Sequence, residues 1–474
     1  MARGSKKPIW RWLFLGSGLL AFAGSAIYGP RLYEIARVAS AFYAKTLCSG
    51  VFVSGRDAKS VIEEDLLADM TPLLNGVSAR IVREPPAVTA SVLGITTQKA
   101  VYRQGLGCTL AIGQTESSLR AQARALDLGN VVSDSNALWP DGTHVALGGS
   151  PEIDASVLKT ALDDAFSEPD PERLRRTRAI VIVHKGRIVA ERYAPGIGPQ
   201  TALIGWSMTK SIFNALTGIL VGDGKLSIEN QGLLAEWRGK GDRRGKISLD
   251  NLLRMSSGLA FGEDYDAMLS DVLQMLFLEG DKARFAANQP LISAPGTVRD
   301  YSSGTSNIVA RILREAKGGT LVDYLSFPRR ALFDRIGVRS AVNEPDASGN
   351  FVASSFMFAS PRDWARLGLL FLNDGVWNGS RILPKGWLAY SLKPTLRKES
   401  SYGAHIWIDF PKSEKPRQEL NPPIPKSTYY MLGHDGQMVA VLPARDLVIV
   451  RMGVSRREGA WSHSAFLSNV LKAF

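Results

Sequence analysis

Two strand-rich segments far apart in the sequence constrain the fold of this chain more than any other feature. The first is a hairpin in which Ala179–Val183 and Ile188–Tyr193 are the strands and Lys185-Gly186 is the turn. The second lies near the C-terminal end, where Gln437–Leu442 and Leu447–Met452 are strands around another turn. The sequence between the two segments is mainly helical. This order predicts an α+β fold, with one antiparallel sheet flanked by helices and a mainly helical insertion.

Helices can be placed from apolar periodicity and from capping residues. A helix is predicted from about Met208 to Val221, and Gly222-Asp-Gly224 ends it. Ser360-Pro361 begins another helix, which ends near Asn373-Asp-Gly375. A closing helix is predicted from about Glu458 to Ala473.

Composition divides the chain into three predicted parts. Residues 1–45 combine a basic tip with an apolar run, residues 46–168 form a small α/β accessory region without a chemical motif, and residues 169–474 carry the paired strand segments. The polar stretch Ser167–Glu172 is predicted to be a linker. The accessory region follows a predicted helix over residues 31–47, and its predicted strands are Val51–Val53, Ser78–Val82 and Cys108–Ile112.

The N-terminal part has the pattern of a membrane-targeting segment. Four basic residues precede the uncharged apolar run Trp12–Tyr28, which is at the lower limit of length for crossing a bilayer. Charge before the run predicts a cytoplasmic N-terminus and places the rest of the chain on the outer side. The run is either a retained signal anchor or a signal peptide cut near Ala21-Phe-Ala23. We therefore expect a bacterial cell-envelope protein, anchored in the inner membrane or released into the periplasm.

Cys48 and Cys108 are the two cysteines of the chain, and both follow the apolar run. An even count in an oxidising compartment predicts a disulfide between them. The alternative is two unrelated buried thiols.

The net charge of +12 raises the question of nucleic-acid binding. Residues 1–45 carry seven Lys and Arg residues against the single acid Glu34, so much of the excess lies in the N-terminal tip. The densest basic stretch elsewhere is Arg238–Lys246, which lacks phosphate-loop spacing and is predicted to be a solvated loop. We expect no nucleic-acid partner, and the sequence leaves the oligomeric state open.

Several common active sites have no counterpart in the sequence. The five histidines form no zinc-type pair at helical spacing, and neither Gly-x-Ser-x-Gly nor a Gly-x-Gly-x-x-Gly after a strand occurs. We therefore expect no metal and no cofactor.

Ser207-Met-Thr-Lys210 is the motif that carries chemistry. A serine hydroxyl needs an adjacent base, and positions i and i+3 share one face of a helix. Lys210 can act as that base if burial lowers its pKa. The alternative is an ordinary N-cap serine, and Ser-x-x-Lys recurs at Ser156–Lys159. Ser207 differs because it opens an amphipathic helix just after a hairpin.

Two further segments follow in order along the chain. Tyr301 lies after a Pro-Gly turn and before a predicted helix, and His434-Asp435-Gly436 leads into the C-terminal strands. With these segments, residues 170–474 resemble the class C β-lactamase and D-Ala-D-Ala peptidase superfamily. The likeness is greatest to the branch of 6-aminohexanoate-dimer hydrolases and related esterases.

The resemblance implies a β-lactamase/transpeptidase-like fold and a role for each motif. Ser207 is the acylated nucleophile, Lys210 the base and Tyr301 the proton relay to the leaving group. His434, Asp435 and Gly436 form the third motif beside the substrate. The backbone N–H groups of Ser207 and Gln437 form the oxyanion hole.

The second motif departs from the Tyr-x-Asn of β-lactamases, because Ser303 stands where the Asn is usual. This change weakens the case for β-lactam chemistry more than the case for acyl transfer, and Asn307 is a possible substitute one helical turn further on. We expect a serine hydrolase acting on a small-molecule amide or ester. The alternatives are a β-lactamase or D-Ala-D-Ala carboxypeptidase acting on cell-wall peptides, and a membrane-anchored envelope protein that binds without catalysis.

Overall fold

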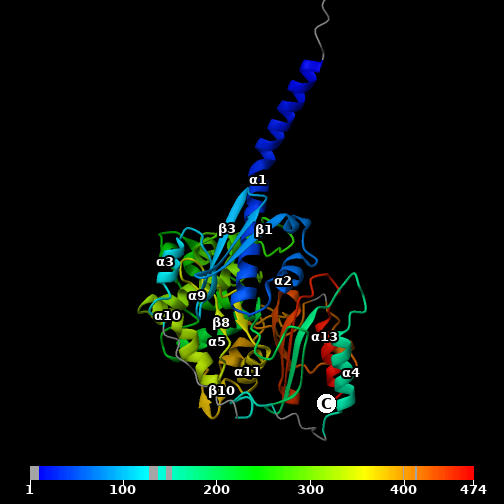
Figure 1. Cartoon of the computed structure of the whole chain (residues 1–474). Helices are drawn as coiled ribbons and strands as arrows, with labels where there is room; N and C mark the ends of the chain where they lie inside the picture. The colour runs from blue at the N-terminus through cyan, green and yellow to red at the C-terminus, as the bar shows by residue number, and fades with distance from the viewer. Residues whose placement is uncertain (1–9, 127–136, 146–151, 399, 412–413) are drawn as a thin grey trace, which may run out of the picture.

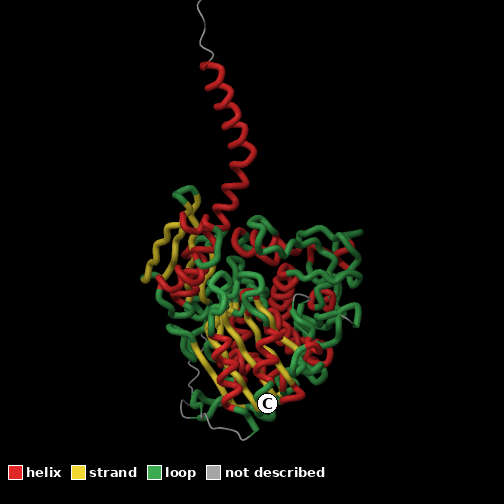
Figure 2. Tube along the Cα trace, turned by 90° about the vertical axis from the view of Figure 1, so that its right-hand side faces the viewer, coloured by secondary structure: helices red, strands yellow, loops and turns green. Residues whose placement is uncertain are grey.

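A computed structural model describes residues 10–126, 137–145, 152–398, 400–411 and 414–474, with side chains from residue 29 onward. Helix α1 is long and projects from the body of the molecule (Figure 1). The remaining elements form the body (Figure 2).

The bounds of the elements are as follows. The helices are α1 (Trp10–Phe52), α2 (Ala58–Val61), α3 (Glu116–Ala121), α4 (Ala155–Phe166), α5 (Met208–Gly222), α6 (Leu249–Leu253), α7 (Asp271–Leu278), α8 (Lys282–Ala287), α9 (Ser303–Lys317), α10 (Leu321–Pro328), α11 (Pro361–Leu372), α12 (Trp387–Ser391) and α13 (His463–Leu471). The strands are β1 (Val77–Arg83), β2 (Pro86–Val92), β3 (Thr96–Arg103), β4 (Gly107–Leu110), β5 (Thr177–His184), β6 (Arg187–Tyr193), β7 (Leu203–Ile204), β8 (Val342–Asn343), β9 (Met357–Ala359), β10 (Val376–Trp377), β11 (Ser380–Arg381), β12 (Tyr429–Gly433), β13 (Gln437–Leu442) and β14 (Leu447–Gly453).

The central sheet joins the two strand-rich segments of the sequence. Its order is β12-β13-β14-β5-β6, and every neighbouring pair is antiparallel. Strand β14 pairs with β5, so the end of the chain closes onto the first hairpin. The predicted antiparallel sheet with a helical insertion is confirmed. Strand β12 was not predicted.

Both faces of the central sheet are covered by helices. Val181 and Val183 of β5 point into the larger core, whereas Ile180 and Ile182 point into a second core beneath α4 and α13. Helices α4 and α13 lie side by side in Figure 1. On the other face α11 packs closely, because a Cβ added at its Gly368 would come within 2.5 Å of a Val448 methyl group.

Most predicted helices form where expected, for local reasons. Ser360 caps α11 by accepting a hydrogen bond from the Asp363 N–H, with Pro361 in the first turn. Helix α5 was predicted to be amphipathic, but Met208–Leu220 are all buried, polar side chains included, because other elements cover it on nearly all sides. The closing helix α13 is shorter than predicted, beginning at His463 with Ser462 as its cap.

The accessory region packs on the serine-bearing region rather than standing apart. Strands β1–β4 form an antiparallel meander against the buried half of α1, and Cys48 of α1 is joined to Cys108 of β4 by the predicted disulfide. The buried residues of α1 belong to the same apolar core as α5 and α9. The boundaries 46–168 and 169–474 stay a prediction.

A buried carboxylate fastens the two regions together. Glu344 is fully buried and accepts hydrogen bonds from Lys45 Nζ, from Ser49 Oγ at 2.8 Å and from the Cys108 N–H at 2.6 Å. Burial lowers the pKa of Lys45, and the negative charge of Glu344 opposes that shift. Lys45 of α1 and two groups of the accessory region therefore depend on one acid of the serine-bearing region.

Of two predictions for the N-terminal part of the chain, one is wrong and one is not confirmed. Val51–Val53 was predicted as a strand, which is wrong, because α1 continues to Phe52. The predicted membrane segment Trp12–Tyr28 lies within α1, but its side chains fall outside those described. Among the described residues, no helix combines the length and apolar character that crossing a membrane requires. The membrane segment is thus not confirmed.

Candidate active site

Ser207 and Lys210 meet at the start of α5. The Ser207 hydroxyl makes no capping hydrogen bond to the helix, so the ordinary N-cap interpretation is wrong. Instead, Lys210 Nζ donates to Ser207 Oγ at 2.9 Å. Trp206, just before the serine, has a φ of +47°, a conformation costing about 1–3 kcal/mol for a large side chain. Strain held at such a position is typical of functional sites.

The environment of Lys210 suits a base. The side chain is only 1% exposed, and burial lowers its pKa to about 8, with the charge of Glu263 opposing the shift. Its other hydrogen bonds go to Ser303 Oγ at 3.2 Å and to the Ser354 carbonyl oxygen at 3.1 Å. Roughly one molecule in ten then carries the neutral amine at pH 7, far more than an exposed lysine would.

Ser303 links Lys210 to an acid that the sequence analysis missed. It accepts from Lys210 Nζ, and its own hydroxyl donates to Glu263 Oε1. The Ser303 N–H donates to Glu263 Oε2 at 2.7 Å, so the carboxylate also satisfies the first turn of α9. Burial raises the pKa of Glu263 against the opposing charge of Lys210. The departure from Tyr-x-Asn therefore creates a chain from amine to hydroxyl to carboxylate.

Asn307 does not take over the position of the missing amide. Its Nδ2 donates to Ser354 Oγ at 3.2 Å, and its Oδ1 accepts from the Ser354 N–H at 3.3 Å. The side chain is 1% exposed. Asn307 therefore holds in place the segment whose Ser354 carbonyl oxygen accepts a hydrogen bond from Lys210 Nζ.

Tyr301 lies over the amine, just before α9. The Lys210 Nζ is 4.8 Å from the centre of its ring, and Trp407 stacks on the ring with centroids 5.6 Å apart. Burial raises the pKa of Tyr301 most, and the charge of Glu263 raises it further. A hydrogen bond with Ser207 opposes this shift. The phenol therefore stays protonated near neutral pH, which fits a proton donor rather than a base.

The third motif lies between β12 and β13 beside Ser207. Asp435 and Gly436 both have positive φ, +60° and +81°, which gives the tight turn its shape. His434 Nε2 is 3.2 Å from Asp435 Oδ1, and the His434 ring stacks on Tyr265 with centroids 4.7 Å apart. Buried Arg451 holds the turn by donating to the Asp435 and Gly436 carbonyl oxygens.

The two N–H groups predicted to form the oxyanion hole differ in whether they already donate a hydrogen bond within the protein. Among the described residues, no group accepts a hydrogen bond from the Ser207 N–H, as expected for an N–H that faces a ligand. The Gln437 N–H donates to the His434 carbonyl oxygen, and the Gln437 side chain bonds to Gly453. An oxyanion at this site would share the Gln437 N–H with that turn.

One open cleft of about 630 Å³ is lined by part of the predicted site. Its lining includes Ser207, Tyr301 and the third motif, together with Glu263 and Trp407. Lys210, Ser303 and Gln437 are buried and do not line the cleft. The far wall is formed by the loop at residues 455–463.

The second Ser-x-x-Lys motif, at Ser156 and Lys159, lacks the buried surroundings of Ser207. Ser156 and Lys159 lie on the exposed face of α4, and Lys159 pairs with Asp163 rather than with the serine. The position of Ser207 after a hairpin was therefore the informative signal.

Sequence reasoning missed Glu263, Tyr265, Trp206 and Trp407. Glu263 and Tyr265 lie in a loop between α6 and α7, about 40 residues before the Ser303 that Glu263 contacts. No regular spacing relates them to the motifs. The aromatic and acidic composition of Phe261-Gly-Glu-Asp-Tyr265 was the available signal.

We expect Glu263→Gln to change the pH dependence of turnover more than the fold. Removing the negative charge lowers the pKa of Lys210 further, because Glu263 now raises it. In a plot of kcat/KM against pH, the rising limb that reports deprotonation of Lys210 should move to lower pH by about one unit. Asp266→Asn, an exposed acid in the same loop, is the control and should leave the limb in place. An unmoved limb in Glu263→Gln would contradict the linkage.

Comparison with known proteins agrees with this geometry. The family described as Beta-lactamase matches residues 162–459. The curated 6-aminohexanoate-dimer hydrolase of Paenarthrobacter ureafaciens is 24% identical over 318 residues, covering 65% of this chain and 79% of that protein.

Two solved structures show the same fold. One is described as "Putative 6-aminohexanoate-dimer hydrolase from Bacillus anthracis", with a TM-score of 0.53 and 22% identity over 66% of this chain and 80% of that chain. A penicillin-binding protein homologue from Caulobacter crescentus has a TM-score of 0.53 and 14% identity, covering 67% and 96%. The family match covers more than half of the sequence, and the chain belongs to the beta-lactamase family of serine hydrolases.

Proposed function

We propose that the protein hydrolyses an amide or ester through an acyl-enzyme on Ser207. The observation that carries the proposal is the 2.9 Å hydrogen bond between Lys210 Nζ and Ser207 Oγ, made by an amine whose pKa burial lowers to about 8. A neutral amine beside the hydroxyl is what an unactivated serine needs in order to attack a carbonyl carbon.

The proposed reaction has two halves. The neutral Lys210 amine accepts the Ser207 proton while Oγ bonds to the substrate carbonyl carbon, and the carbonyl oxygen becomes an oxyanion near the Ser207 N–H. Tyr301 donates its proton to the leaving nitrogen or oxygen as that bond breaks, and recovers a proton from the Lys210 ammonium. A water molecule then attacks the acyl-enzyme and returns the proton to Ser207 Oγ, releasing the acid.

The similarity to known proteins and the residues of the site together favour a linear amide over a β-lactam as substrate. The 6-aminohexanoate-dimer hydrolase relative suggests a linear amide, and Ser303, committed to Lys210 and Glu263, presents no amide group to a β-lactam. We therefore place β-lactam or D-Ala-D-Ala peptide hydrolysis second. A binding-only role is third, since it has no need of a perturbed Lys210.

A panel of substrates tests the proposal. We expect the protein to hydrolyse p-nitrophenyl acetate or 6-aminohexanoate dimer, and Ser207→Ala to reduce kcat/KM to the background rate. Nitrocefin and a D-Ala-D-Ala peptide separate the second possibility. Ser156→Ala is the matched control and should retain full activity. Equal turnover by Ser207→Ala and the parent would overturn the proposal.

We also propose export to the bacterial envelope through the N-terminal segment. Its support is the basic tip, the apolar run Trp12–Tyr28 and the Cys48–Cys108 bridge, which oxidising compartments favour. Fractionation with carbonate extraction distinguishes an anchored from a released form, and recovery of the reduced protein in the cytoplasm would contradict export.

A further inference from the structure

A second, mostly apolar pocket of about 240 Å³ adjoins the catalytic cleft. Helix α1 contributes Val38, Ala39 and Phe42, and α7 contributes Leu273 and Phe277 on the opposite side. Phe42 and Phe277 meet edge to face with centroids 5.4 Å apart. The accessory region contributes Met70 and Leu74, so the pocket depends on α1 and on the accessory region, and these lining residues lie before the residues matched by the family.

The pocket reaches the immediate neighbourhood of the nucleophile. Trp206, the residue before Ser207, lines it, and its ring meets His434 edge to face at 5.7 Å. Tyr265 and His434 line both the pocket and the catalytic cleft. This stacked pair is therefore the wall that the two cavities share.

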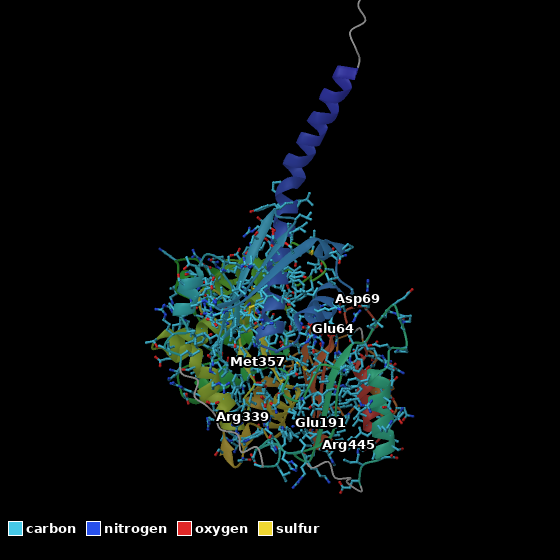
Figure 3. The ribbon with its side chains drawn as sticks, in the orientation of Figure 1. Glu64, Asp69, Glu191, Arg339, Met357 and Arg445 are labelled. Carbon is cyan, nitrogen blue, oxygen red and sulfur yellow. A yellow bond between two sulfur atoms is a disulfide. The ribbon has the colours of Figure 1, made fainter. Side chains whose placement is uncertain are left out.

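Three of the charged side chains that line the pocket, Asp69, Asp435 and Arg456, lie in ion pairs. The fourth, Asp266, is exposed and makes no ion pair among the described residues. Most of the other lining side chains are apolar or aromatic, which suits an apolar chain. Asp69, labelled in Figure 3, pairs with Arg176 and with Arg457 at 3.4 Å. Arg456 lies 3.7 Å from Asp435 and donates to the carbonyl oxygens of Asp65 and Ala68 at 2.6 Å. These bonds tie residues 65–69 of the accessory region to the serine-bearing region and hold this side of the pocket in place.

The place of Tyr301 indicates which end of a substrate the pocket would take. Tyr301 lines the open cleft but does not line the apolar pocket. Because the proposed function makes Tyr301 the proton donor to the leaving group, the leaving group occupies the open cleft. The pocket on the Trp206 and Tyr265 side is then available to the acyl end.

We propose that this pocket binds an apolar acyl chain and makes the enzyme selective for medium-chain acyl esters or amides. The inference rests on the proposed function, and it assigns a role to the accessory region as a wall of the substrate site. Each methylene group buried there adds to binding, so kcat/KM should rise with chain length until the pocket is full.

A chain-length series tests the pocket. With p-nitrophenyl esters from acetate to dodecanoate, we expect kcat/KM to rise at least about tenfold between acetate and octanoate. Met268→Trp fills the pocket from the loop before α7 and should lower the octanoate-to-acetate ratio at least about fivefold. If Met268→Trp does not fold, Met70→Trp fills the pocket from the accessory region and should lower the same ratio. Ile292→Trp, on an exposed side chain outside both cavities, is the matched control.

A binding measurement separates this inference from the proposed function. In Ser207→Ala protein, a dansylated undecanoic acid should bind saturably, be displaced by decanoate, and bind at least about tenfold more weakly when Met268→Trp is added. Such binding, together with no ester turnover by the parent protein, would support the pocket while overturning the proposed chemistry. Ser207-dependent acetate turnover with no chain-length preference and no saturable binding would overturn the pocket and leave the chemistry standing.

Discussion

Lys210→Met should lower the rate of Ser207 acylation by roughly 10³-fold, within the range that a positioned base contributes. Methionine is apolar and of similar length, so it fits a site that is 1% exposed without burying a new charge. Stopped-flow acylation by an activated ester measures the effect, and thermal unfolding checks the fold. Lys210→Cys alkylated with bromoethylamine restores an amine at nearly the same reach and should recover much of the rate. Parent-like acylation in Lys210→Met would exclude Lys210 as the base.

The pH profile of the parent supplies an independent check on the same residue. The base must be neutral, and its pKa is lowered to about 8, so kcat/KM should rise as pH increases through about 8 and then level off. An ordinary exposed lysine would place this limb more than two units higher. The limb should vanish in Lys210→Met. A profile that is flat between pH 6 and 9 would contradict the assignment.

The second large effect is on stability, at the buried acid between the two regions. Glu344→Gln should lower the free energy of unfolding by about 3 kcal/mol, because it leaves the Lys45 ammonium buried without its counter-charge. Denaturant unfolding followed by tryptophan fluorescence measures this loss. Limited proteolysis should show earlier cleavage in residues 46–168, where Ser49 and Cys108 also bond to Glu344.

Two variants control the stability experiment. Glu63→Gln breaks an exposed pair with Lys59 and should change stability little. Lys45→Met combined with Glu344→Gln removes the unpaired charge and should recover part of the loss. If Glu344→Gln unfolded like the parent, the buried pair would not be what fastens the accessory region.

The main fold was predictable because it depends on periodic patterns. The hairpin around Lys185-Gly186 and the strands near the C-terminus have local signals, and their pairing through β14 and β5 follows from burying both faces. The strand prediction for Val51–Val53 was wrong because β-branched and aromatic residues also fit a buried helix face. Packing of α1 against β1–β4 outweighs their strand propensity. Strand β12 was missed because its pairing partner, rather than its sequence, defines it.

The candidate site was predictable as far as its motifs extend. Ser207, Lys210 and Tyr301 meet as expected, and Ser303 was identified as the unusual member. Glu263 was missed because its contact with Ser303, 40 residues further on, joins a loop to a helix start and leaves no periodic pattern in the sequence. The Gln437 N–H was predicted to be an oxyanion donor, and in the structure it donates to the His434 carbonyl oxygen across the turn at Asp435.

The most direct measurement of the central claim is to locate the covalent intermediate. The protein is treated with a fluorescent alkyl phosphonate, digested, and the labelled peptide is sequenced by mass spectrometry. The account predicts one adduct, on Ser207, formed much more slowly in Lys210→Met and absent in Ser207→Ala. An adduct on another residue that persists in Ser207→Ala would contradict it.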